Sequence, residues 1–378
     1  MKKICLIFGL CAVVLSKAEA FETSARNAIL VDFDTGTYLF AKNETEQIPP
    51  ASMSKLMTVY ILFDRLKSGI LSLDDEWVVS ENAWSKGGAA SGGSTMFLNI
   101  GQTVKVDDLL RGIIVQSGND ACIVAAENIS GSEENFARLM NETASKLGLK
   151  NASFANATGL PDENQRMSVE DLAILARAII KDFGDYYHIF QEKEFTYNKI
   201  KQGNRNPLLY SMEGADGLKT GHTEEAGFCL TGSVQKNGRR LIEVVAGLSS
   251  NQARSDEAKN LMNYGFQEFE NYTLFNKGQV IGVVPVWYGN QATVDMTVSN
   301  DIVRTYHKNK ADKYTFKMIY DTPVKAPIAK GTRVGQIKIT SPDGQTEYIN
   351  LVAAKDVAKV GIFKRILANL KYYLKGRQ

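Results

Sequence analysis

Apolar and polar residues follow two different periods within residues 21–270, and these periods predict a mixture of strands and helices. Short β-prone runs at 28–32 and 37–41 flank a turn at 34–36, which predicts a hairpin. Ser52 opens a run with apolar residues at helical spacing, which predicts a helix that ends near Gly69. We expect further helices at 106–115, 121–129, 133–147, 169–181 and 252–264, and strands at 227–234 and 240–247 joined by a turn at 236–238. Such a mixture predicts an α+β domain.

Residues 271–354 have a different pattern, because nearly every segment there alternates between apolar and polar residues. The runs at 279–287, 292–298, 315–319, 335–340 and 346–351 are separated by Gly, Pro, Asn and Asp. Short strands with such turn residues between them predict a small all-β sandwich as a second domain. Its only histidine is His307, and we find no catalytic grouping of side chains in it.

The first twenty residues have the three parts of a secretory signal peptide. Lys2 and Lys3 precede an apolar run from Ile4 to Leu15, and the small-x-small sequence at 18–20 forms a cleavage site. The apolar run has 12 residues, fewer than the ~20 needed to cross a bilayer. We therefore expect export and cleavage before Phe21 rather than a retained transmembrane helix.

The chain has a formal net charge of +2, which conceals a strongly basic C-terminus. Residues 355–378 contain seven lysines and arginines against one aspartate, so residues 21–354 are acidic overall. Apolar residues recur at helical spacing from Val360 to Leu374, and Lys364 and Lys371 lie off that stripe. This pattern predicts an amphipathic helix that lies on the surface of an anionic membrane and is too charged to span it. The alternative is a helix that docks on the β-domain.

Two cysteines, Cys122 and Cys229, remain after removal of the signal peptide. They do not make a disulfide framework, and we expect each to be a small buried apolar residue. No pair of histidines or cysteines has the spacing of metal ligands, and the basic residues gather in one terminal helix rather than between aromatic residues. The sequence therefore gives no support for a metal, a cofactor or a nucleic-acid partner, and it leaves the oligomeric state open.

Ser52 and Lys55 form a Ser-x-x-Lys motif at the predicted helix start, which places the hydroxyl and the amine on one face of the helix. A serine hydroxyl needs a neighbouring base to become a nucleophile. Lysine is such a base when burial and nearby positive charge lower its pKa. The motif alone is weak, because Ser233 and Lys236 match it within a strand and turn, and because an N-cap serine beside a surface lysine has the same sequence.

Two further motifs follow along the chain. Ser117 and Asn119 form Ser-x-Asn in a loop between two predicted helices, and Lys-Thr-Gly at 219–221 lies on the strand before the second hairpin turn. Here lysine supplies charge, threonine a hydroxyl donor, and glycine room for a substrate carboxylate to approach the strand edge. Each motif alone is also compatible with an ordinary turn or a solvated strand edge. All three in this order are the motif set of penicillin-recognising serine enzymes.

With these motifs the sequence resembles the low-molecular-mass penicillin-binding proteins of the serine D-alanyl-D-alanine carboxypeptidase family (peptidase S11). Residues 50–58, 117–122 and 216–223 carry the resemblance, which extends over the whole chain. It implies a β-lactamase-like domain with an antiparallel sheet flanked by helices at 21–270, the β-sandwich at 271–354, and a membrane-anchoring helix at 355–378. It also implies removal of D-alanine from peptidoglycan stem pentapeptides at the periplasmic face of the bacterial inner membrane, in cell-wall maturation and cell shape.

The resemblance also implies roles for residues at matching positions. Ser52 would be the acylated nucleophile and Lys55 its general base, and Ser117 would complete the proton relay. Asn119 would hold the substrate peptide, and the backbone N–H groups of Ser52 and His222 would form the oxyanion hole. The residues implied to bind the terminal carboxylate, or to support its recognition and deacylation, are Lys219, Thr220, Gly221, His222, Arg254 and Arg205. β-Lactam antibiotics would acylate Ser52 as substrate mimics.

Two other enzyme classes and one non-enzyme class fit these motifs less well. A class A β-lactamase has Ser-Asp-Asn where residues 117–119 are Ser-Gly-Asn, and Glu163 is not followed by the Leu-Asn that such an enzyme needs. A Ser-His-Asp hydrolase is disfavoured, because the chain has only three histidines and no Gly-x-Ser-x-Gly. A non-catalytic cell-wall binding protein on the same fold stays open as an alternative, although all three motifs are intact.

Overall fold

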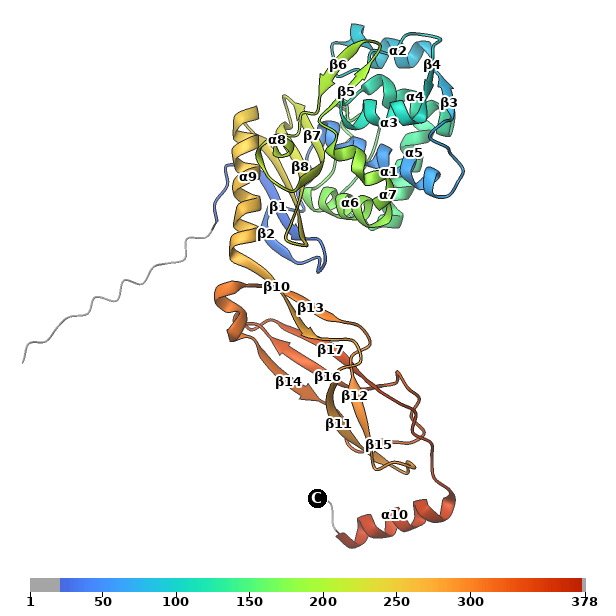
Figure 1. Cartoon of the computed structure of the whole chain (residues 1–378), viewed down its shortest axis with the longest axis vertical. Coiled ribbons are helices and arrows are strands. Elements are labelled where there is room, and N and C mark those ends of the chain that lie inside the picture. Colours follow the sequence, from blue (N-terminus) through green and yellow to red (C-terminus); the bar gives the residue numbers. More distant parts are fainter. Residues whose placement is uncertain (1–20, 376–378) are drawn as a thin grey trace, which may run out of the picture.

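The computed structural model describes residues 21–375, so the predicted signal peptide at residues 1–20 lies outside the described residues. Two domains follow one another along the long axis of the molecule, and the C-terminal helix lies beyond the far end of the second domain (Figure 1). The first domain has a sheet with helices on both of its faces, and the second is built from strands. The predicted order of an α+β domain, an all-β domain and a terminal helix is confirmed.

A five-stranded antiparallel sheet forms the centre of the first domain, with the strand order β2-β1-β9-β8-β7. Its strands are β1 (Asn27–Asp32), β2 (Tyr38–Lys42), β7 (Ala215–Thr223), β8 (Gly227–Lys236) and β9 (Arg239–Leu248). Both predicted hairpins are confirmed, and the pairing of β1 with β9 joins them into one sheet. The strand β7, which carries the Lys-Thr-Gly motif, lies at one edge of this sheet.

Helices cover both faces of the sheet, because successive residues of each central strand point to opposite sides. On one face Ile29 and Val244 join the larger core, and on the other face Leu30 and Val245 pack with Leu261 of the long helix α9. The helices of the larger side are α1 (Lys55–Lys67), α2 (Glu81–Gly87), α3 (Val106–Ile114), α4 (Asn119–Ser130), α5 (Glu133–Leu147), α6 (Val169–Asp182) and α7 (Gly184–Tyr187). The opposite face is covered by α8 (Leu208–Ser211) and α9 (Asn251–Glu268).

Two short two-stranded sheets of the first domain were not predicted from the sequence. Each of their strands has only three or four residues, which is too short to establish an alternating pattern. They are formed by β3 (Glu76–Val78) with β4 (Thr103–Lys105), and by β5 (Glu194–Tyr197) with β6 (Ile200–Gly203).

The second domain is all-β, as predicted, and contains a six-stranded sheet with the order β14-β16-β17-β12-β11-β15. Its strands are β11 (Val280–Trp287), β12 (Thr293–Thr297), β14 (Thr315–Ile319), β15 (Val324–Lys325), β16 (Arg333–Thr340) and β17 (Thr346–Ala353). A ribbon of β10 (Phe269–Phe275) and β13 (Ile302–His307) adjoins the first domain and was not predicted. The strand β10 continues directly from α9, which ends at Glu268 rather than near Tyr264 as predicted.

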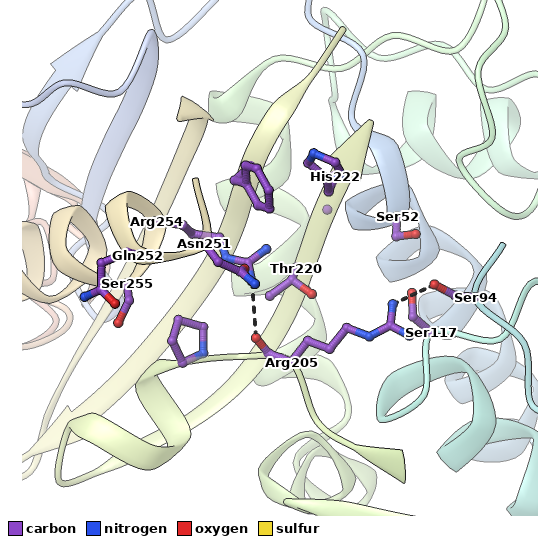
Figure 2. Close-up of a pocket in the computed structure, with 13 residues that line it drawn as sticks. Ser52, Ser94, Ser117, Arg205, Thr220, His222, Asn251, Gln252, Arg254 and Ser255 are labelled. Atoms are coloured by element: carbon purple, nitrogen blue, oxygen red, sulfur yellow. Dashed lines mark hydrogen bonds between the residues drawn. The ribbon is translucent and has the colours of Figure 1, made fainter. Parts of the chain in front are cut away.

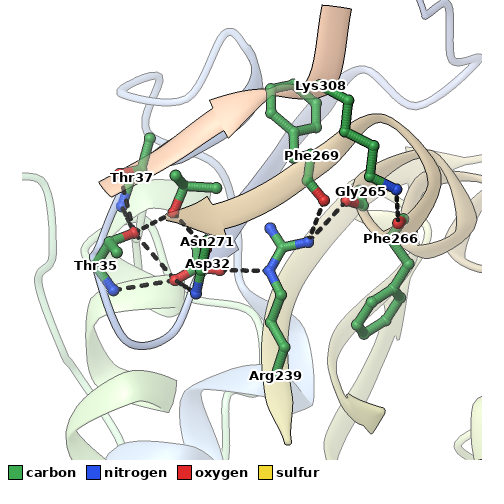
Figure 3. A network of polar contacts seen from close by, with 10 residues as sticks. Asp32, Thr35, Thr37, Arg239, Gly265, Phe266, Phe269, Asn271 and Lys308 are labelled. Atoms are coloured by element: carbon green, nitrogen blue, oxygen red, sulfur yellow. Dashed lines mark hydrogen bonds and ion pairs between the residues drawn. The ribbon is translucent and has the colours of Figure 1, made fainter. Parts of the chain in front are cut away.

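A buried ion pair of the first domain is hydrogen-bonded to the first strand of the second domain (Figure 3). Asp32, at the end of β1, is fully buried and accepts a hydrogen bond of 2.8 Å from Nε of Arg239. Nη1 of Arg239 donates to the carbonyl oxygens of Gly265 and Phe269, where α9 passes into β10. Nδ2 of Asn271, on β10, donates to the Asp32 carboxylate at 3.3 Å. One carboxylate therefore connects the sheet of the first domain to the first strand of the second.

The helix α10 (Ile362–Lys375) confirms the predicted C-terminal helix and presents apolar side chains to solvent. Phe363 is 85% exposed, and the side chains of Ile366 and Leu367 are also exposed. A hydrogen bond of 2.6 Å from the Tyr288 hydroxyl to Oδ1 of Asn369 connects the helix to the second domain. None of the helices within residues 21–375 is both long enough and apolar enough to cross a bilayer.

Candidate active site

Ser52 and Lys55 lie where the chain enters α1. Pro50 precedes a single 3-10 turn at Ala51–Ser54, and α1 begins directly after this turn. Nζ of Lys55 lies 3.0 Å from Oγ of Ser52, which is hydrogen-bond distance. The fold therefore brings together the hydroxyl and the amine of the first motif, although a 3-10 turn rather than the predicted α-helix carries the serine.

Lys55 is fully buried and makes two further hydrogen bonds. Its Nζ donates to Oδ1 of Asn119 at 2.8 Å and to the carbonyl oxygen of Thr158 at 2.5 Å. Burial lowers the pKa of Lys55 to about 8, because removal from water disfavours the charged ammonium. Near neutral pH, this lysine is a free amine far more often than an exposed lysine is.

The second motif lies at the start of α4. Ser117 has a φ of +62°, a left-handed backbone conformation that turns the chain between α3 and α4. Ser117 and Asn119 are both buried, and Ser117 lines the same cleft as Ser52. Ser117 lies in the predicted loop, whereas Asn119 is already the first residue of the helix.

The third motif lies on β7, as predicted, with Lys219 and Thr220 buried in the edge strand. Burial lowers the pKa of Lys219 well below its ordinary value, and the positive charges of Lys55 and Arg205 lower it further. The strand lysine and the Ser-x-x-Lys lysine are therefore close enough to repel each other when both are charged.

The structure gives a reason for glycine at position 221 that differs from the predicted one. A Cβ atom at this position would lie 2.9 Å from the carbonyl oxygen of Pro50 and 3.2 Å from Cβ of Ala51. The absence of a side chain therefore allows β7 to pack directly on the turn that carries Ser52. Gly221 also lines the cleft beside Ser52, and the predicted room for a substrate carboxylate stays a prediction.

A cleft with a volume of about 600 Å³ lies beside Ser52 (Figure 2). A neighbouring hollow shares Ser52 and Arg205 with it and is lined by Asn119 as well. Seven of the ten predicted site residues line the first cleft: Ser52, Ser117, Arg205, Thr220, Gly221, His222 and Arg254. The fold therefore gathers these residues from the turn before α1, the loops before α4 and α8, the strand β7 and the helix α9 around one opening.

The two arginines are held in place by hydrogen bonds at the cleft wall (Figure 2). Nη1 of Arg205 donates to Oγ of Ser94 at 2.6 Å, and Nη2 of Arg254 donates to the carbonyl oxygen of Arg205 at 3.4 Å. Burial lowers the pKa of Arg254 to about 10. His222 lies at the rim, with its ring 4.0 Å from that of Phe228. Two guanidinium groups beside the serine make the cleft suited to an anionic group.

Residues that shape the cleft wall were missed by the sequence analysis. The fully buried carboxylate of Asp120, directly after the second motif, accepts hydrogen bonds of 2.6 Å from the Thr95 hydroxyl and of 2.8 and 3.0 Å from the N–H groups of Met96 and Leu98. These bonds tie the segment that carries Ser94 to α4. The only signal in the sequence was an acidic residue directly before the predicted helix at 121–129.

Cys122 and Cys229 are free and buried, as predicted. Burial raises the pKa of the Cys122 thiol to about 12. Within residues 21–375 no three side chains of the His, Cys, Asp or Glu type are placed to hold a metal ion together.

Comparison with known proteins identifies the family of this site. The sequence profile described as D-alanyl-D-alanine carboxypeptidase, Peptidase S11, matches residues 14–250, which is more than half of the chain. The chain belongs to this family. The profile described as penicillin-binding protein 5, C-terminal domain, matches residues 269–359. The predicted family and class of enzyme, a serine D-alanyl-D-alanine carboxypeptidase, are therefore confirmed.

Several members of the family are similar over most of the chain. The D-alanyl-D-alanine carboxypeptidase DacD of Escherichia coli (strain K12) is 38% identical over 348 residues, which cover 91% of this chain and 90% of that protein. DacF of Bacillus subtilis (strain 168) is 37% identical over 344 residues, covering 89% and 87%. The crystal structure of penicillin binding protein 5 from Haemophilus influenzae has a TM-score of 0.82 at 37% identity, covering 91% of this chain and all of that one. These matches extend over both domains and confirm the predicted fold class.

Proposed function

We propose that this carboxypeptidase removes the terminal D-alanine from peptidoglycan stem pentapeptides through an acyl-enzyme on Ser52. The observation that carries the proposal is the distance of 3.0 Å between Oγ of Ser52 and the buried amine of Lys55, beside a cleft with two guanidinium groups. Relatives named D-alanyl-D-alanine carboxypeptidases support this choice of substrate.

Acylation begins when Lys55 takes the proton of Ser52 and Oγ attacks the carbonyl carbon between the two D-alanines. The N–H groups of Ser52 and His222 stabilise the oxyanion that forms. The proton then passes through Ser117 to the nitrogen of the departing D-alanine. The C–N bond breaks, D-alanine leaves, and the rest of the peptide stays on Ser52 as an ester.

Deacylation returns the enzyme to its starting state. Water loses a proton to the basic groups of the site and attacks the ester carbonyl, and the ester C–O bond breaks to restore the Ser52 hydroxyl. A β-lactam follows the first stage, but its cleaved ring nitrogen remains tethered to the acyl group. We propose that this tethered fragment delays water and makes β-lactams long-lived ligands of Ser52.

Recognition of the terminal carboxylate is assigned to Lys219, Thr220 and Arg254, with Asn119 holding the peptide before it. Thr220 and Arg254 line the cleft, and the charge on Lys219 is disfavoured by burial and by neighbouring cations. A bound carboxylate offsets both effects, because an anion stabilises each of these cations. The cleft therefore favours a substrate that ends in a free carboxylate.

The proposal is tested by incubating the enzyme with a stem pentapeptide that ends in two D-alanines and measuring free D-alanine by mass spectrometry. The Ser52→Ala variant is expected to lose activity by about 10³-fold or more, because the nucleophile is absent. Ser145→Ala, an exposed serine on α5, is the matched control and retains full activity. Equal release by Ser52→Ala and the wild type would remove Ser52 from the mechanism.

We also propose that residues 1–20 direct export and that α10 attaches the enzyme to the periplasmic face of the inner membrane. The exposed side chains of Phe363, Ile366 and Leu367 support this proposal, together with the basic residues of the same segment. The test is sedimentation with vesicles that contain phosphatidylglycerol. Deletion of residues 360–378 and the single change Phe363→Glu should both leave more protein in the supernatant, with D-alanine release unchanged. Continued sedimentation of the truncated chain with vesicles would contradict the anchor.

A further inference from the structure

A lysine that acts as a base for Ser52 needs a lone pair that faces the hydroxyl, as well as a lowered pKa. A neutral amine has two N–H bonds and one lone pair. Oδ1 of Asn119 at 2.8 Å and the carbonyl oxygen of Thr158 at 2.5 Å are both hydrogen-bond acceptors. When they take the two N–H bonds of Lys55, the lone pair is left toward Oγ of Ser52 at 3.0 Å. The Thr158 carbonyl therefore helps to orient the Lys55 amine toward Ser52.

The Thr158 carbonyl belongs to a loop that the side chain of Asn156 organises. Oδ1 of Asn156 accepts hydrogen bonds from the N–H of Thr158 at 3.1 Å, the Thr158 hydroxyl at 2.9 Å and the N–H of Gly159 at 2.8 Å. Nδ2 of Asn156 donates to the carbonyl oxygen of Leu160 at 3.1 Å. Four hydrogen bonds from one side chain thus fix the backbone on both sides of the Thr158 carbonyl.

The same loop is packed tightly against α1 and the turn that precedes it. The Thr58 hydroxyl donates to the carbonyl oxygen of Ala157 at 2.8 Å. Gly159 has a φ of +79°, and a Cβ atom there would lie 2.0 Å from the carbonyl oxygen of Ala51. The loop is therefore held by its contacts with α1 and by the hydrogen bonds of Asn156. As a result, the Thr158 carbonyl has little freedom to move away from Lys55.

We propose that Asn156 is a positioning residue, which acts through the Thr158 carbonyl to orient the Lys55 amine toward Ser52. This inference rests on the proposed function, because it assigns Asn156 to the acylation step. Asn156 itself lines neither the cleft nor the hollow beside Ser52, whereas Thr158, Gly159 and Leu160 of its loop line that hollow. We therefore expect Asn156 to act mainly on the rate of the chemical step, with a smaller effect on substrate binding.

The charges that face Lys55 come from several elements. Arg205, Lys219, Asp120 and the Cys122 thiol all act on the lysines of the site. The neutral side chain of Asn156 adds no charge to this group, so Asn156→Ala changes the hydrogen bonds of the loop alone. Asn156→Asp keeps an acceptor oxygen for the N–H groups of the loop and adds a negative charge near Lys55, which favours the ammonium.

The test is the pH dependence of D-alanine release, with kcat and KM measured separately, for the wild type and three variants. Asn156→Ala should lower kcat by tenfold or more, with a smaller change in KM. Asn164→Ala is the matched control, since Asn164 is an exposed asparagine of the same segment whose side chain makes no hydrogen bond within residues 21–375; it should behave as wild type. Asn156→Asp should recover kcat at high pH to within about threefold, with the rise in rate displaced to higher pH.

Several outcomes would overturn the inference. A folded Asn156→Ala enzyme with kcat within twofold of the wild type would show that the loop needs no such support. If Asn156→Ala does not fold, Asn156→Asp decides the matter, and a pH profile that matches the wild type would refute the assigned role. Failure of the proposed function is a separate result, because it appears as a wild type that releases no D-alanine. In that case NMR of lysine-labelled protein still measures the pKa of Lys55. An Asn156→Asp variant with the same Lys55 pKa as the wild type would overturn the role assigned to Asn156.

Discussion

Replacement of Glu243 by glutamine is expected to raise the free energy of unfolding, by an amount that increases with pH. Glu243 lies in the middle of β9, fully buried, between Leu30 on β1 and Gly232 on β8. A Cβ atom at Gly232 would lie 3.1 Å from a Glu243 carboxyl oxygen and 2.8 Å from Cδ1 of Leu208, so the carboxyl is enclosed by the sheet and α8. Within residues 21–375 neither carboxyl oxygen has a hydrogen-bond partner. Burial raises the pKa of Glu243 well above its ordinary value.

The size of the effect follows from the difference in proton binding between the folded and unfolded chain. An unfolded glutamate loses its proton near pH 4.3, whereas the folded Glu243 keeps its proton to higher pH. The stability linked to this proton is complete below pH 4.3 and is lost as pH rises toward the folded pKa, by about 1.4 kcal/mol per pH unit. Glutamine of the same shape does not titrate, so Glu243→Gln avoids this loss. The variant should therefore gain, at most, about 1.4 kcal/mol relative to the wild type for each pH unit above pH 5 over which the folded Glu243 keeps its proton.

The assay is urea unfolding followed by circular dichroism at pH 5, 6 and 7, for the chain from Phe21 onward. Other carboxylates titrate alike in the wild type and the variant, so they cancel in the difference between the two. Glu142→Gln, at an exposed position on α5, is the control and should show no such trend. A difference between Glu243→Gln and the wild type that is the same at pH 5 and pH 7 would refute the reasoning.

Three further predictions concern the site and the domain junction. The rate of acylation by benzylpenicillin should rise with pH and level off above pH 8, because burial lowers the pKa of Lys55 to about 8 and the base must be neutral; a flat profile from pH 6 to 9 in gel labelling would contradict this. Asp32→Ala should destabilise the protein by about 3–5 kcal/mol in thermal unfolding, since it leaves the largely buried Arg239 without its ion pair. Asp120→Ala should slow acylation and lower the melting temperature, because three hydrogen bonds to residues 95–98 are lost; unchanged values of both would count against the supporting role.

Elements with a clear period and clear ends could be predicted closely from the sequence. The predicted helix at 133–147 agrees with α5, because the Ser132 side chain caps its first turn and Gly148 ends it in a left-handed conformation. In contrast, β10 was missed because α9 passes into it at Glu268 and Phe269 without an intervening Gly or Pro. The end of this helix is set by the pairing of β10 with β13, which is a tertiary contact and leaves no local signal.

The residues of the candidate site likewise fall into those that could be predicted from the sequence and those that could not. Ser52, Lys55 and Asn119 could be named from motifs, because the chemistry there depends on the identity of side chains. The Thr158 contact could not be predicted, because a backbone carbonyl is available at every residue and only the folded loop selects this one. For the same reason Asn156, which acts on the backbone of that loop, gave no signal in the sequence.

The most direct test of the central claim is to find where a β-lactam binds covalently. The chain is incubated with benzylpenicillin, digested with a protease and examined by tandem mass spectrometry. We expect one adduct with the mass of the intact antibiotic on the peptide that contains Ser52, and no adduct in the Lys55→Ala variant at early times. An adduct on any other residue, or labelling of Lys55→Ala at the rate of the wild type, would contradict a serine that is activated by its neighbouring lysine.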